Sequence, residues 1–233
     1  MKRRLVTAPS YGREEPARRP RALAFWLALV GALIVVAYAG RASSGKPGQQ
    51  FLYHWSTGVG AIVQDGIVLV LVLWIAGFSR DLLALRRPRS FGNAAIVLVS
   101  ALVAVYLFEG IYSALAHPGN EQGLTPAHWE PSHAAAYVVN SIVICTWVPF
   151  VEELTYRGLG CSLLEPYGQW TAILVVGLLF GLSHGLFVSL PVIALFGCVL
   201  AWVRFRTDSV FPGMALHGAF NLIALVAAVT IHR

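Results

Sequence analysis

The sequence predicts an all-α, polytopic bundle of about seven transmembrane helices, and three observations lead to this fold class. Apolar residues make up 57% of the 233 residues and charged residues only 12%, whereas about a quarter of a soluble domain is charged. The mean hydropathy is high, at +0.68. The apolar residues also gather in runs close to the roughly 20 residues that a helix needs to cross a bilayer. This composition excludes a disordered chain, a disulfide-rich secreted scaffold and nearly every kind of water-soluble enzyme.

Seven apolar windows follow one another along the chain: 22–40, 59–78, 94–116, 134–151 (continuing past an acidic pair), 170–187, 190–205 and 209–231. They are too long, and alternate too little, for barrel strands, and in lipid only a helix satisfies its backbone within one segment. The first window follows a basic leader and contains Ala37-Tyr38-Ala39, which resembles a signal-peptidase site. Its 19 residues exceed a typical signal h-region, so we expect a retained first span.

Basic residues predict the orientation of the bundle, because lysine and arginine gather in cytoplasmic loops. Residues 1–21 contain seven basic residues against two glutamates, the loop 79–93 contains four arginines, and the loop 117–133 contains none. We therefore predict a cytoplasmic N-terminus, with 79–93 inside and 117–133 outside. A basic tail beside a span is also more typical of contact with anionic lipid than of nucleic-acid binding, so no nucleic-acid partner is expected.

Ionisable side chains within the predicted spans are few, and they are expensive enough in lipid that they usually face a polar interior and serve function. In chain order they are Asp65, Glu109, Glu152, Glu153, Arg157, His184 and His217. Glu153 and Arg157 are four residues apart on one helix, so they share a face and can form an ion pair. Glu152 is turned by about 100° from Glu153 and is free to point elsewhere.

The two later spans supply further polar groups. His184 lies immediately beside a stripe of small residues that would let another helix approach closely, formed by Gly177, Gly181 and Gly185. His217 and Asn221 are four apart and share one helix face. Taken singly, each of these residues has a structural explanation, such as a hydrogen bond between helices. Together, a carboxylate, two histidines and an amide are the groups needed to activate water and stabilise an oxyanion.

The membrane depth of these residues sets a condition on the fold. If all seven helices were straight and of equal length, Glu152 would lie towards the inner face and His184 towards the outer face. We therefore expect either that Glu152 lies nearer the middle of the membrane or that the fifth span, 170–187, is short or tilted.

Three motifs along these spans resemble, in order and in spacing, those of the CAAX prenyl protease and bacteriocin-processing (CPBP, or Abi-type) family of intramembrane endopeptidases. They are Glu152-Glu153-x-x-x-Arg157, Phe180-x-x-x-His184 and His217-x-x-x-Asn221. The resemblance covers roughly residues 134–230, and within the motifs the sequence shows no departure from the family pattern.

The resemblance implies a role for each motif residue. Glu152 and His184 would hold and activate water, and His217 and Asn221 would stabilise the oxyanion. The supporting residues would be Glu153 and Arg157. On this interpretation the protein is an intramembrane endopeptidase that hydrolyses a peptide bond of a membrane-associated protein or peptide, such as a C-terminal tail, a sorting signal or a leader.

Two other classes of function remain open. One is a transporter in which Asp65, Glu109, Glu152 and the histidines form a proton or ion relay. Against it, we find no repeated halves or paired broken helices of the kind seen in many transporters. The other is a non-catalytic immunity or scaffold protein that binds the transmembrane helix of a partner. A scaffold would tolerate Glu152→Ala, whereas a hydrolase would not.

We expect no cofactor, with zinc as the alternative. Glu152, His184 and His217 could supply the two-histidine, one-carboxylate set of some catalytic zinc sites, but no HExxH motif is present. Asn221 is a poor zinc ligand and a good neutral hydrogen-bond donor, which favours a metal-independent mechanism in which Glu152 itself takes the proton from water.

We divide the chain into a basic cytoplasmic tail (1–21), N-terminal transmembrane helices (22–133) and a catalytic transmembrane core (134–233). The protein is expected to be a multi-pass protein of the cell membrane whose partners are the bilayer and a membrane-associated peptide substrate. The odd number of cysteines, with no metal-type spacing, indicates neither a disulfide framework nor a cysteine zinc site; they are Cys145, Cys161 and Cys198.

Overall fold

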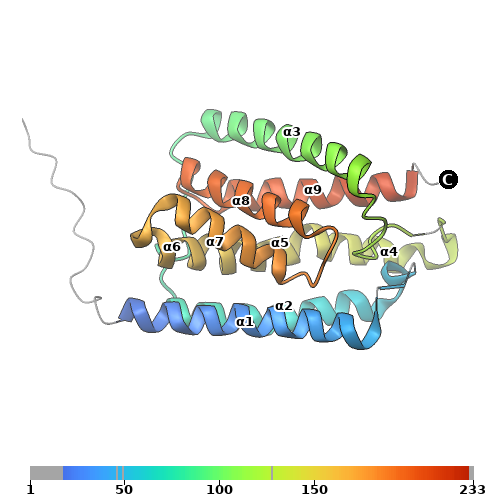
Figure 1. Ribbon diagram of the computed structural model, residues 1–233, viewed down its shortest axis with the longest axis horizontal. Coiled ribbons are helices and arrows are strands. Elements are labelled where there is room, and N and C mark those ends of the chain that lie inside the picture. Colours follow the sequence, from blue (N-terminus) through green and yellow to red (C-terminus); the bar gives the residue numbers. More distant parts are fainter. Residues whose placement is uncertain (1–17, 46, 49, 127, 231–233) are drawn as a thin grey trace, which may run out of the picture.

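The structure is a computed structural model that describes residues 18–230 apart from 46, 49 and 127 (Figure 1). All regular elements among these residues are helical, which confirms the predicted fold class. Residues 1–17, most of the predicted basic tail, lie outside the described residues. Six helices are long and apolar enough to cross a membrane, and a seventh apolar helix is shorter. The chain is therefore a multi-pass membrane protein, as predicted.

The long helices fall on the predicted windows, with ends that differ by a few residues. They are α1 (Arg18–Ser44), α2 (Trp55–Ala76), α3 (Phe91–Ala116), a composite helix over Pro131–Tyr167, α8 (Leu190–Thr207) and α9 (Phe211–Thr230). The composite helix contains α4 (Ala134–Ile142), α5 (Val148–Glu152) and α6 (Cys161–Leu164), joined by the π-helical segments Val143–Trp147 and Glu153–Gly160. The shorter apolar helix is α7 (Gln169–Leu182). Single-turn bulges of π-helix are common at functional sites, and the predicted acidic motif lies where α5 meets the second π segment.

Consecutive helices run back and forth, so the connections gather at two ends of the bundle (Figure 1). We call residues 77–90, 165–168 and 204–210 the arginine end, because six arginines lie there: Arg80, Arg86, Arg87, Arg89, Arg204 and Arg206. The opposite end consists of residues 45–54, 117–133 and 183–189. At the arginine end, Asp208 binds Arg86 at 2.6 Å and Arg89 at 3.2 Å, which ties the α2–α3 loop to the turn before α9.

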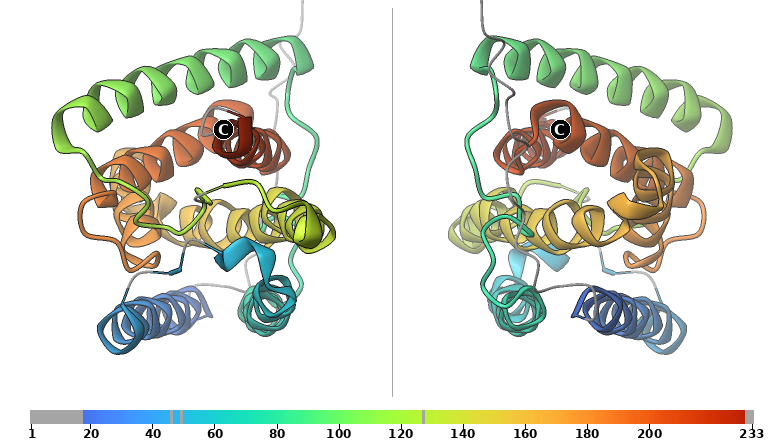
Figure 2. Two further views of the ribbon diagram at one scale, coloured as in Figure 1. Left: turned by 90° about the vertical axis from the view of Figure 1, so that its right-hand side faces the viewer. Right: turned by 90° about the vertical axis from the view of Figure 1, so that its left-hand side faces the viewer.

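The helices form layers that place the composite helix in the interior. Figure 2 shows α1 and α2 side by side on one face and α3 on the opposite face, with α8, α9, α7 and the composite helix between them. The core contains fully buried side chains such as Trp26, Leu159 and Leu200. Large apolar side chains such as Val63 and Leu107 remain exposed on the outer helices, as expected where a helix faces lipid.

Two of the three glycines in the predicted stripe lie at the contact between two helices. A Cβ atom on Gly177 would lie 2.6 Å from Cys198 N, and one on Gly181 would lie 2.9 Å from Ala194 Cβ, so both glycines let α7 pack directly against α8. Gly185, however, lies beyond the end of α7 at a φ of 63°. It is a turn glycine that approaches Ala37 of α1 and does not belong to the α7–α8 contact, because α7 ends at Leu182.

The short length of α7 explains how His184 can lie at the same depth as Glu152. With 14 residues, α7 spans only about 21 Å at 1.5 Å per residue, so it ends before it has crossed a bilayer core of about 30 Å. Glu152 meanwhile lies near the middle of the composite helix. The structure thus combines a short fifth span with a Glu152 in the middle of the long fourth helix. The segment after α7 lies level with Glu152.

Candidate active site

Three separate helices bring the catalytic candidates together. Glu152 is the last residue of α5, His184 lies in the turn after α7, and His217 lies in α9. The Nε2 atom of His184 is 3.9 Å from Glu152 Oε1, and the Nε2 atom of His217 is 3.6 Å from Glu152 Oε2. The carboxylate of Glu152 therefore lies between the two imidazole rings.

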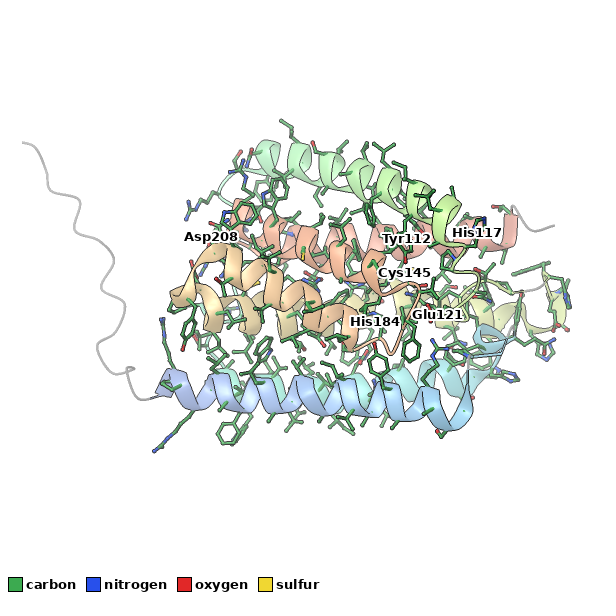
Figure 3. All side chains as sticks on the ribbon, in the orientation of Figure 1. Tyr112, His117, Glu121, Cys145, His184 and Asp208 are labelled. Carbon is green, nitrogen blue, oxygen red and sulfur yellow. The ribbon has the colours of Figure 1, made fainter. Side chains whose placement is uncertain are left out.

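These groups line a cavity of about 460 Å³, together with Asn221 and apolar side chains. The side chains of Glu152 and His184 are 20% and 26% exposed, so both are accessible from the cavity. Figure 3 shows His184 on the side of the molecule towards Glu121, far from Asp208. The cavity combines an accessible carboxylate and two histidines with a wall of apolar and neutral polar side chains.

The predicted ion pair between Glu153 and Arg157 is confirmed. Arg157 Nη1 lies 3.0 Å from Glu153 Oε1, and both side chains are fully buried. Arg157 also donates from Nη2 to Gly197 O at 3.1 Å, and its guanidinium lies 4.1 Å from the ring centroid of Phe180. The neighbouring acids thus have different environments: Glu153 is locked in the protein interior, whereas Glu152 faces the cavity.

Hydrogen bonds orient both histidine rings. His217 Nδ1 is 3.2 Å from Glu153 Oε1, and His184 Nδ1 is 2.8 Å from the carbonyl oxygen of Phe180. A carbonyl or an ionised carboxylate can only accept, so Nδ1 carries a hydrogen in both rings. Each ring consequently turns its Nε2 atom towards Glu152, where it can meet water or substrate.

Asn221 lies one turn after His217, on the wall of the same cavity. Its Nδ2 atom donates to the carbonyl oxygen of Ile144 at 2.9 Å, in the first π segment of the composite helix. A primary amide has two N–H groups, so one remains beyond the bond to Ile144. All six residues to which the family resemblance gives a catalytic or supporting role therefore lie in or directly behind one site.

Phe180 joins these residues, although the sequence assigned it no role beyond its place in the motif. Its ring centroid is 4.7 Å from that of His184 and 5.8 Å from that of His217. Arg157 lies over the same ring. This aromatic side chain fixes the spacing of both histidines against the buried ion pair.

A second group of polar contacts, which the sequence does not predict, holds residues 185–189 just after His184. The carboxylate of Glu121 accepts from the backbone N–H groups of Phe187 and Ser189 at 2.9 and 2.7 Å. Arg41 donates to Gly185 O at 3.1 Å and to the backbone oxygen of Glu121 at 2.8 Å. Neither residue lies in a motif, and the contacts join segments up to 144 residues apart, so no local pattern could reveal them.

The geometry also bears on metal binding. Over residues 18–230, with the three gaps already named, no group of three or more histidine, cysteine, aspartate or glutamate side chains is placed to hold a metal ion. All three cysteines are free.

Comparison with known proteins gives a family match for part of the chain. Residues 134–223 match the family model described as type II CAAX prenyl endopeptidase, Rce1-like. The match runs from the start of α4 into α9 and includes all three motifs, and it confirms the resemblance to the CPBP family. The matched family is a peptidase family. Comparisons with curated proteins and with solved structures gave no match.

Proposed function

We propose that this membrane protein, with its peptidase-family segment, is an intramembrane endopeptidase of the cell membrane that hydrolyses a peptide bond of a membrane-associated protein or peptide. The observation that carries the proposal is the position of Glu152. It lies within 4 Å of two oriented histidines, on the wall of a cavity that is otherwise mostly apolar.

Glu152 and His184 activate the water. Hydrogen bonds of about 2.8 Å allow one water molecule to contact both groups across their 3.9 Å separation. Glu152 takes a proton from this water while the water oxygen attacks the carbonyl carbon of the substrate. The same proton then passes from Glu152 to the leaving amine as the C–N bond breaks, which regenerates the carboxylate.

His217 and Asn221 stabilise the tetrahedral intermediate. Protonated at Nε2, His217 donates to the developing oxyanion, and the second N–H of Asn221 donates beside it. The Glu153–Arg157 pair holds His217 in place through the bond at Nδ1. On this account Glu153 and Arg157 act as positioning residues and do not touch the substrate.

The proton relay is the less supported alternative. Asp65 and Glu152 do line one small cavity of about 110 Å³. Glu109, however, lines other cavities, with Ser113 and Thr125 among their walls. None of these cavities, all formed by residues that the structure describes, is lined by all three acids.

A proteomic comparison tests the proposal. Cells that produce Glu152→Gln protein should accumulate uncleaved precursors that are absent with the wild type, because the amide cannot take a proton. Glu165→Gln is the matched control, since Glu165 is exposed at the arginine end and outside the cavity. Identical precursor profiles for wild type and Glu152→Gln, at equal protein levels, would favour a scaffold.

A further inference from the structure

We infer that the active-site cavity opens at the outer face of the membrane and admits an uncharged peptide segment presented there. This inference rests on the proposed function and specifies its substrate class. It follows from three observations: the segments that form the mouth of the cavity, the closure of the cavity on the other side, and the distribution of arginine in the fold.

The mouth of the cavity belongs to the opposite end of the bundle. Phe51 and Ser56 line it from the α1–α2 connection and the start of α2, and Gln122 and Leu124 line it from the α3–α4 connection. None of the described residues of the arginine end lines it. The position of His184 in Figure 3 agrees, because it lies towards Glu121 and away from Asp208.

Towards the arginine end the site is closed by packed side chains. Directly behind Glu152 lies the ion pair of Glu153 and Arg157, with no exposed side-chain surface. Leu154 and Leu159, further along the composite helix, are buried to within 1%. A substrate therefore has no open route to Glu152 from the arginine end.

Charge assigns the two ends to opposite faces. The arginine end carries six arginines, and α1 also begins there (Figure 1). Seven basic residues lie within residues 1–21, before α1 and in its first turn. By sequence, the basic residues nearest the opposite end are Arg41, Lys46 and Arg233, and Arg41 donates to two backbone oxygens inside the fold. Because cytoplasmic loops carry the excess of lysine and arginine, the arginine end is cytoplasmic and the mouth is outside.

The lining of the cavity indicates what enters it. Apart from Glu152 and the two histidines, the wall consists of apolar side chains and of neutral polar ones such as Ser56, Gln64 and Gln122. Away from Glu152 and the histidines, a charged substrate side chain would find no charged partner and would lose its hydration. The site therefore suits an extended apolar or neutral segment of an exported peptide or of a membrane protein's outer flank.

Cysteine labelling tests the orientation of the mouth. In a variant without the native cysteines, Ser56→Cys should react with a membrane-impermeant maleimide on intact cells, because Ser56 is exposed at the mouth. Arg87→Cys, which is exposed at the arginine end, should react only after the cells are permeabilised. Gln122→Cys provides a second mouth position if Ser56→Cys protein is poorly produced. Labelling of the mouth cysteines only in permeabilised cells, or of Arg87→Cys on intact cells, would overturn the inference.

The effect of the label on cleavage tests the entry route. Labelled Ser56→Cys protein should lose cleavage of the precursors, whereas labelled Ser132→Cys protein should retain it. Ser132 is exposed at the same end but does not line the cavity. Undiminished cleavage after complete labelling of Ser56→Cys would show that substrate enters elsewhere. The side from which the cysteines are labelled can be measured without any proteolysis. The Glu152→Gln experiment therefore tests the proposed function, and the labelling experiment separately tests this inference.

Discussion

Glu121 should control the position of the loop that carries His184, and Glu121→Gln tests this. The loop 183–189 is held by side chains from three other segments. Besides Glu121 and Arg41, Tyr38 donates to Leu186 O at 2.9 Å and Tyr112 donates to Val188 O at 2.6 Å. A loop near the membrane interior needs such partners, because lipid offers no hydrogen bonds to free backbone groups.

The expected magnitude follows from the bonds that Glu121 accepts. Two of them are short, at 2.9 and 2.7 Å, and a third, from Val188 N, is 3.4 Å. A hydrogen bond to a charged group contributes about 1 kcal/mol more than one between neutral groups. The neutral amide of Glu121→Gln should therefore cost about 2 kcal/mol over the two short bonds. This corresponds to an increase of about 30-fold in the fraction of molecules with a released loop.

The pH dependence gives an independent prediction. Burial alone would raise the pKa of the Glu121 carboxyl, but hydrogen bonds from the backbone N–H groups of Phe187, Ser189 and Val188 hold it below its ordinary value of 4.5. Because the folded-state pKa is lowered, the stabilisation is complete above the unfolded-state pKa and is lost as the pH falls through the folded-state value. The difference between wild type and Glu121→Gln should therefore be full at pH 7 and shrink in acid.

Hydrogen exchange of the purified protein in micelles measures both effects. The amides of Phe187 and Ser189 should exchange faster in Glu121→Gln at pH 7, and cleavage should fall by more than the loss of folded protein explains. Glu130→Gln is the control, because Glu130 lies in the same connection but contacts His128, His133 and Gln50. Exchange in residues 185–189 that is the same in Glu121→Gln as in the wild type would refute the reasoning.

Three further outcomes are expected. Arg157→Ala should lower the free energy of unfolding by about 3–5 kcal/mol, because it leaves Glu153 buried without its partner. Thermal unfolding measures this loss, and an unchanged melting temperature would contradict the pairing. Gly213→Ala should reduce cleavage in a single-turnover assay, since its Cβ would lie 2.5 Å from Glu153 Oε2 and displace the group that orients His217. Exhaustive chelation of the purified protein should leave cleavage intact, whereas stoichiometric zinc whose removal abolishes and whose return restores cleavage would overturn the glutamate-only mechanism.

Local patterns were sufficient to predict the spans and the grouping of the motif residues. Apolar runs determine where helices lie in a bilayer, and a spacing of four residues determines that Glu153 and Arg157 share a face. The early end of α7 was anticipated only as one of two options, because its apolar run continues past Leu182 while the turn at Gly185 depends on the close approach of Ala37. The contacts of Glu121 and Arg41 required the folded chain, since they join distant segments through backbone atoms that any sequence would offer.

The shortness of α7 has a consequence for the surrounding lipid. Trp170, Leu174 and Leu178 are exposed along its outer face, so lipid chains lie against a helix about 9 Å shorter than a bilayer core of average thickness. Such hydrophobic mismatch is relieved when the bilayer thins locally. A transmembrane helix that approaches α7 would enter this thinned region, where its terminal turns lose their lipid cover and unwind more readily. We therefore expect the bilayer to be thinner beside the active site, and the activity to depend on the acyl-chain length of the host bilayer.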